Sequence, residues 1–201
     1  CNALRELAIQ ASEIGEYEEA VNIWQKLIEL QSNDAGAFMN MGYAFLMMKQ
    51  YDKAVEHSKK AMDLDAGLRE AALNYSAAEL IAGDVKKAIS TLESILKKHF
   101  DYPPAMGRVA AAYMIDGRIE EGLKYIDRLN TKGFDCSFIL EEQSRAFFAE
   151  GKNEQAVVLL QAAIHKEIAN GSIHALLAEC QQKMMKCSAH VPGPVVSSCM
   201  M

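Results

Sequence analysis

Residues 35 to 68 read AGAFMNMGYAFLMMKQYDKAVEHSKKAMDLDAGL, and a relative of this stretch lies 34 residues away in either direction. Two sets of small residues keep that step along the chain. Gly42 corresponds to Ala8, Ser76, Ala110, Ser144 and Ala178, and Ala54 corresponds to Ala20, Ala88, Gly122 and Ala156. A fixed step of this length indicates a repeat architecture, in which each repeat packs only against its neighbours.

Each repeat carries two amphipathic helical patterns separated by a short turn. In the first repeat, Leu4, Leu7 and Ala11 share one helical face, and Gly15 ends the pattern because glycine adopts a left-handed cap without a Cβ penalty. The same position holds Gly83, Gly117 and Gly151 later in the chain, whereas Lys49 predicts a costlier turn. We expect the small residues where two helices cross, with a large residue on the partner helix beside them.

The 34-residue step, the small residues and the paired helices resemble the tetratricopeptide repeat. The resemblance implies an all-α fold: an α-solenoid of about five helical hairpins plus a C-terminal capping helix, wound as a right-handed superhelix. We expect a single array over residues 1–187. Its predicted parts are repeats at 1–34, 35–68, 69–102, 103–136 and 137–170, a capping helix at 171–187 and a disordered tail at 188–201.

Composition narrows the class of protein. A net charge of −6 argues against nucleic-acid binding, which relies on a basic field. The sequence contains no run of about 18 apolar residues, so it predicts no integral membrane segment. The five cysteines form an odd set without a CxxC pair, so neither a disulfide framework nor a zinc site is expected, and a reducing, cytoplasmic compartment is favoured. A chain that begins at Cys1 also resembles a lipoprotein matured at its lipid-bearing cysteine, which keeps a periplasmic or membrane-tethered location open.

The sequence predicts no enzyme, metal or cofactor. The five histidines are scattered, no HExxH pattern occurs, and no glycine-rich phosphate loop is present. Adjacent glutamates such as Glu120 and Glu121 point about 100° apart on a helix, so they do not form a carboxylate pair.

The resemblance places a concave groove along the first helices of the repeats. The side chains that it assigns to this surface are mostly apolar in the middle of the array. The predicted partner-binding residues are Met39, Asn40, Tyr43, Leu46, Met47, Leu73, Asn74, Leu80, Ile81, Arg108, Met114, Ile115 and Phe148. An apolar stripe with methionines suits a peptide or an amphipathic helix, and Asn40, Asn74 and Arg108 are expected to bond a peptide backbone.

Some family members clamp the C-terminal carboxylate of a chaperone with basic residues. Glu70 stands where that clamp has a lysine, which disfavours such a partner here. We therefore predict a non-enzymatic adaptor or scaffold that binds a segment of a partner protein in an apolar concave groove. The alternatives are an assembly factor that is lipid-anchored through Cys1, or the regulatory domain of a larger enzyme. If the groove does not bind a partner, we expect its apolar positions to be covered by neighbouring helices, by the tail or by a second copy of the chain.

Overall fold

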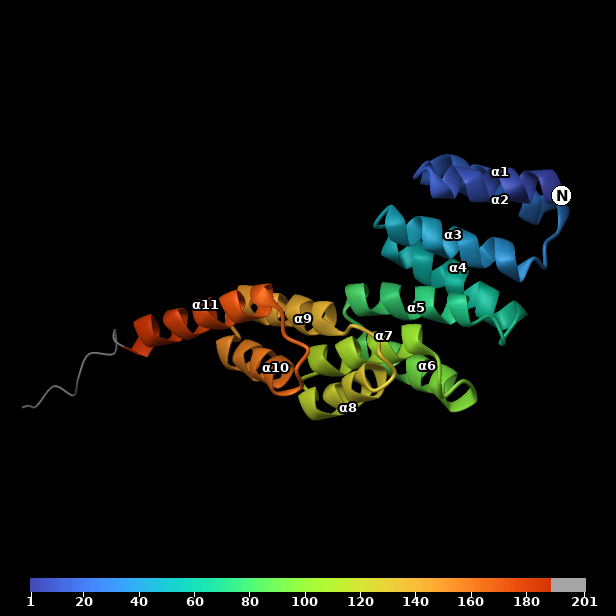
Figure 1. Cartoon of the computed structure of the whole chain (residues 1–201). Helices are drawn as coiled ribbons and strands as arrows, with labels where there is room; N and C mark the ends of the chain where they lie inside the picture. The colour runs from blue at the N-terminus through green and yellow to red at the C-terminus, as the bar shows by residue number, and fades with distance from the viewer. Residues whose placement is uncertain (189–201) are drawn as a thin grey trace, which may run out of the picture. The chain divides into compact units, whose positions relative to one another are not determined.

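The computed structural model describes residues 1–188, which contain eleven α-helices and no strand (Figure 1). The chain divides into two compact units, residues 1–129 and residues 130–201. Unit 1 holds α1 (Asn2–Glu13), α2 (Tyr17–Leu30), α3 (Ala35–Met47), α4 (Tyr51–Leu64), α5 (Arg69–Ala82), α6 (Val85–Lys98), α7 (Pro103–Ile115) and α8 (Ile119–Asn130), the last residue of α8 lying at the boundary. Unit 2 holds α9 (Ser137–Ala149), α10 (Asn153–His165) and α11 (Gly171–Ser188). The predicted tail lies outside the described residues, apart from Ser188 at the end of α11.

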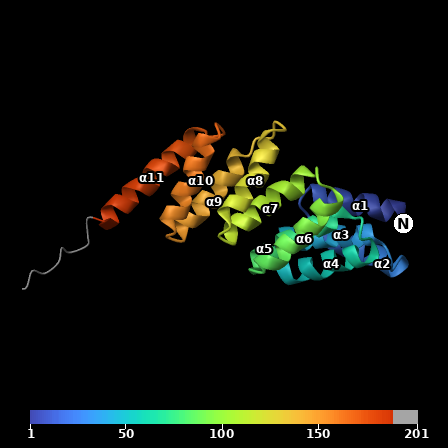
Figure 2. The same ribbon diagram turned by 90° about the horizontal axis from the view of Figure 1, so that it is seen from below.

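The helices form successive hairpins, as predicted. In unit 1, α1 packs on α2, α3 on α4 and α5 on α6, and each hairpin contacts the next (Figure 1). The first helices also meet directly, since α3 contacts α5 and α5 contacts α7. In unit 2, α9 and α10 form a hairpin and α11 lies against both (Figure 2). The predicted all-α stack of hairpins is confirmed.

The repeated small residues are buried where the helices of a hairpin cross. Ala8, Gly42, Ser76 and Ala110 are buried on the first helices, and Ala20, Ala54 and Ala88 are fully buried on the second helices. At Gly42 the approach is so close that an added Cβ atom would overlap Ser58 Oγ and lie 3.1 Å from the Ser58 backbone nitrogen. The three atoms nearest to that Cβ position all belong to Ser58, so two small residues meet at this crossing and the helix backbones lie close together.

The hairpin turns follow the predicted positions. Gly15, Gly83, Gly117 and Gly151 have φ angles between 78° and 89°, the left-handed region that glycine enters without a steric penalty. Lys49 takes the same conformation with φ of 60°, as its place in the register predicts. This turn carries the Cβ cost that the glycine turns avoid.

Unit 2 repeats the packing of unit 1 in α9 and α10, and α11 follows. Ser144 on α9 and Ala156 on α10 are fully buried. Helix α11 buries Ile173, Leu176 and Cys180 on one face, whereas Ala178, which continues the register of Gly42, is exposed. The second helix that would cover Ala178 in a complete hairpin does not occur among the described residues.

Candidate functional site

Three large apolar side chains are exposed at matching ends of the first helices of three successive hairpins, α3, α5 and α7. Met47 on α3, Ile81 on α5 and Ile115 on α7 are 45%, 55% and 42% exposed, and the register spaces them 34 residues apart. Because α3 contacts α5 and α5 contacts α7, these residues form one row across unit 1, here called the apolar row. Exposed apolar residues that recur at one repeat position differ from singly scattered apolar surface residues, which need no explanation.

Other predicted residues lie on the same helices and are partly covered. Tyr43 lies one turn before Met47 and is 39% exposed. Its ring meets that of Tyr17 edge-on, with 6.2 Å between the centroids. Burial, and secondarily Tyr17, raises the pKa of Tyr43. The remaining apolar members are half-buried: Met39, Leu46, Leu73 and Leu80.

Two of the predicted hydrogen-bonding residues connect the first helices of neighbouring hairpins. Asn74 Nδ2 on α5 donates to the Met39 carbonyl oxygen at 3.2 Å, and Arg108 Nη1 on α7 donates to the Leu73 carbonyl oxygen one repeat later. Burial lowers the pKa of Arg108. Asn74 and Arg108 therefore order the stack of first helices, a role that the expectation of peptide binding missed. Asn40 is half-buried at the same repeat position on α3.

Met114 and Phe148 differ from the rest of the predicted set. Met114 has no exposed surface, and its Cγ lies where it would be 2.9 Å from a Cβ atom built on Gly122 of α8. It is a packing residue, so it leaves the candidate surface. Phe148 belongs to unit 2, where it is half-buried and has the Lys183 ammonium of α11 4.3 Å from its ring centroid. In the first repeat, Ile9 has the register of Tyr43 and is 40% exposed, although the predicted set omits it.

The first helix of unit 2 carries Glu141 and Arg145 at the register positions that Leu73 and Ala77 occupy on α5. Glu141 Oε1 accepts a hydrogen bond from Ser172 Oγ at 2.5 Å and from Arg145 Nη2 at 2.9 Å. The Ser172 and Arg145 hydrogen bonds lower the pKa of Glu141. Since Ser172 lies on α11, this cluster closes the α9 surface against α11 rather than leaving it open.

Within residues 1–188, no three His, Cys, Asp or Glu side chains gather where they could hold a metal ion. Cys136 and Cys180 are buried, and burial raises the pKa of both thiols, which makes them less reactive. Of the described helices, none is long and apolar enough to cross a membrane.

Comparison with known proteins identifies the repeats. Residues 13–49 match a family model described as TPR repeat, and residues 45–112 match one described as Tetratricopeptide repeat. The search of curated proteins finds no significant match.

Several solved structures share the fold at low sequence identity. One is YrrB, described as a TPR protein with an unusual peptide-binding site: 17% identity, TM-score 0.67, covering 88% of this chain and 89% of that one. A thermophilic TPR protein of Thermus thermophilus is 16% identical with a TM-score of 0.60, covering 90% of this chain and 98% of that one. MamA of Desulfovibrio magneticus RS-1 is 19% identical with a TM-score of 0.59, covering 94% of each chain. At such identities the likeness concerns the fold.

Proposed function

Because this chain belongs to the tetratricopeptide-repeat family, whose fold serves as a scaffold for protein–protein interaction, we propose that it is a non-enzymatic adaptor that binds an amphipathic helix of a partner protein along the apolar row. The observation that carries the proposal is the exposure of Met47, Ile81 and Ile115 at one repeated position. Burying these side chains against a partner removes apolar surface from water, which is the main driving force for association.

The spacing of the row suits a helical partner. Packed helices lie about 8–10 Å apart, so successive members of the row are separated by roughly that distance. A helix rises about 1.5 Å per residue, and side chains seven residues apart on one face are therefore about 10.5 Å apart. In an amphipathic helix with an apolar residue at every seventh position, the spacing of these residues therefore matches the spacing of the row.

The chemistry of the row supports the same occupant. Methionine is flexible and polarizable, so Met47 can adapt to irregular apolar partners. Tyr43 adds a ring that is partly exposed beside Met47 and carries a hydroxyl group for the polar edge of such a helix. The description of YrrB as a peptide-binding TPR protein lends support from a neighbour of the same fold.

The test combines partner capture with crosslinking. A photo-crosslinking amino acid placed at Met47 should trap a partner protein in its host, and the same group at Val158 of unit 2, which is 44% exposed, serves as the control. The double variant Met47→Asp, Ile81→Asp should lose at least ten-fold in affinity for the trapped partner, whereas Val158→Asp should not. Circular dichroism should give both variants the helicity of the parent chain.

Three results would contradict the proposal. One is crosslinking at Val158 with equal yield. A second is unchanged affinity in the double variant. The third is a crosslink from Met47 only to another copy of the chain, which would reassign the row to self-association; light scattering of the parent and double variant detects that case directly.

A further inference from the structure

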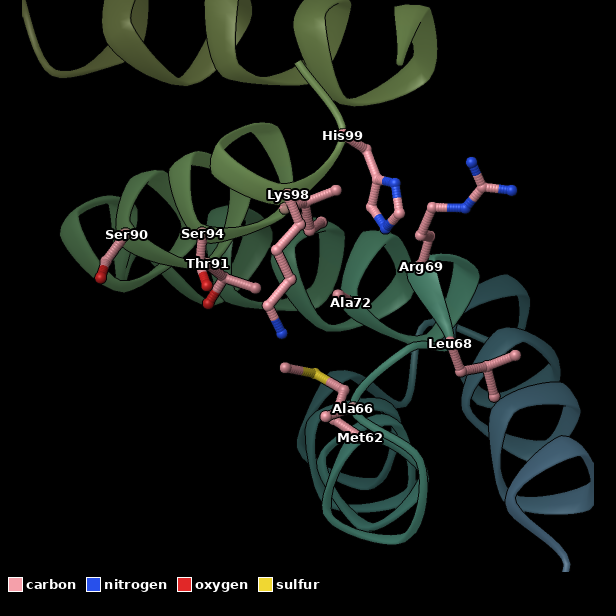
Figure 3. A pocket seen from close by; sticks show the side chains of 11 residues that line it. Met62, Ala66, Leu68, Arg69, Ala72, Ser90, Thr91, Ser94, Lys98 and His99 are labelled. Carbon is pink, nitrogen blue, oxygen red and sulfur yellow. The ribbon is translucent and has the colours of Figure 1, made fainter. Parts of the chain in front are cut away.

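A separate hollow in unit 1 lies between the end of α4, the start of α5 and one face of α6 (Figure 3). Its apolar lining residues include Met62, Ala72 and Ile95. Its volume of about 230 Å³ is smaller than the roughly 300–1,000 Å³ of pockets that hold drug-sized ligands. A small group or a single side chain fits this space.

The rim of the hollow is basic and rich in hydroxyl groups. Thr91, Ser94 and Lys98 are spaced three and four residues apart, which puts them on one face of α6, and His99 follows them. Figure 3 shows the Lys98 side chain extending over the hollow towards Met62, with Thr91 and Ser94 beside it. No carboxylate is among the described residues that line the hollow, although the chain carries a net charge of −6.

The repeat does not require this set of residues. One repeat earlier, the positions of Thr91, Ser94 and Lys98 hold His57, Lys60 and Leu64. Lys97 and Lys98 both lie in the last turn of α6, where cations stabilise the C-terminal end of the helix dipole. That role accounts for a positive charge at the helix end. It does not account for the two hydroxyl groups on the same face of α6, or for the lack of a carboxylate among the described residues that line the hollow.

We propose that this hollow binds a phosphate group, either as inorganic phosphate or as a phosphate monoester on a protein. The rim offers an ammonium, an imidazole and hydroxyl groups as donors, and a phosphate monoester presents three strong acceptor oxygens with about −1.5 to −2 charges at neutral pH. Lysine binds phosphate as a point charge, whereas planar carboxylates are best bound by the two-pronged arginine side chain. Arg69 is the only arginine among the described lining residues, and its guanidinium lies 4.6 Å from the Tyr102 ring centroid. It therefore contributes positive charge near the hollow while it stacks on the Tyr102 ring.

The proposal is independent of the apolar row, because it concerns α4 to α6 on other residues. Its test is a titration of the isotope-labelled full chain with inorganic phosphate, a phosphoserine peptide, the same peptide with glutamate in place of phosphoserine, and acetate. Backbone amide shifts around Thr91, Lys98 and His99 give the dissociation constants. The variant is Lys98→Met, and the matched control is Lys97→Met, an exposed neighbour in the same helical turn that is not among the residues lining the hollow.

We expect saturable shifts with phosphate or the phosphopeptide, at least ten-fold weaker binding in Lys98→Met and unchanged binding in Lys97→Met. Tighter binding of the phosphopeptide than of inorganic phosphate assigns the source to a phosphorylated protein, and equal binding assigns it to the free ion. Equal loss in both lysine variants would overturn the proposal, because it would indicate general electrostatic attraction. Equal binding of acetate or the glutamate peptide would also overturn it.

Discussion

The second and third hairpins of unit 1 carry different pairs of residues at the position where their two helices cross. In α3 and α4, Gly42 meets Ser58, and the helices approach until a Cβ atom has no room. In α5 and α6, the same two positions hold Ser76 and Leu92, both fully buried. A small pair and a larger pair thus occupy one register. The repeat fixes where the helices cross, and the residues fix how closely they approach.

The two hairpins also differ in the residue of the first helix that lies near a lysine of the second helix. Phe45 on α3 has the Lys53 ammonium 5.2 Å from its ring centroid. One repeat later the ring is replaced by the buried carboxylate of Glu79, whose Oε2 lies 3.9 Å from the ammonium of Lys87. Burial, with a hydrogen bond to Glu79, raises the pKa of Tyr75 to about 12. The lysine of the second helix is retained, but on α6 it lies near two carboxylates, Glu79 and the closer Asp84 at 2.5 Å, in place of an aromatic face.

The largest effect is expected from overpacking the third hairpin. Ala88 on α6 is fully buried, so Ala88→Leu should lower the free energy of unfolding by about 1–3 kcal/mol, near the upper end of that range because three carbons are added. Urea denaturation followed by circular dichroism measures the change. The control is Ala82→Leu at the exposed end of α5. Equal midpoints for the two variants would show that Ala88 is not at a tight crossing.

The sequence predicted the fold well because the fold depends on a few small residues at a constant step. Ala20, Ala54 and Ala88 were placed at crossings from the step alone, and all three are fully buried. The contact of Gly42 with Ser58 was not predictable from that step. It depends on how far two backbones close when neither residue has bulk, which is a property of both helices together.

The candidate site was predictable only in part. The register correctly indicates exposure at Met47, Ile81 and Ile115, which occupy the same place near the ends of α3, α5 and α7. It does not reveal what fills the space beside a given side chain. Met114 is buried because Gly122 of α8 leaves room for it, and Asn74 donates a hydrogen bond to α3, the first helix of the preceding hairpin. Both outcomes depend on a neighbour that single positions do not specify. That the row binds a partner remains a prediction.

A smaller effect is expected at the crossing of the second hairpin. Gly42→Ala should destabilise the chain by about 1 kcal/mol, since an overpacking cost of about 1–3 kcal/mol is partly offset by a helix-propensity gain of about 1 kcal/mol. Adding Ser58→Ala removes the nearest atom, Oγ, which finds no hydrogen-bond partner among residues 1–188. The double variant should therefore unfold at a higher urea concentration than Gly42→Ala. If Ser58→Ala gives no recovery, the clash is with the α4 backbone and not with the hydroxyl group.

The smallest effect concerns the turns of the two hairpins. Lys49 has φ of 60° and Gly83 has φ of 89°, so one turn carries a Cβ penalty that the other avoids. A left-handed non-glycine residue costs about 1–2 kcal/mol, and glycine loses about 0.4–1 kcal/mol more through the unfolded chain. Lys49→Gly should thus stabilise the chain by about 0–1.6 kcal/mol, and Gly83→Lys should destabilise it by a similar amount.

Thermal unfolding can resolve this difference, because 1 kcal/mol shifts the Tm of a domain of this size by about 2–4 °C. Lys49→Ala is the matched control: it removes the ammonium but keeps the Cβ atom, so its Tm should stay near that of the parent. An increase in Tm with Lys49→Ala equal to that with Lys49→Gly would assign the cost to the lysine charge. An increase confined to Lys49→Gly assigns the cost to the Cβ atom of a residue held at a left-handed φ, a cost that the glycine turns of the register avoid.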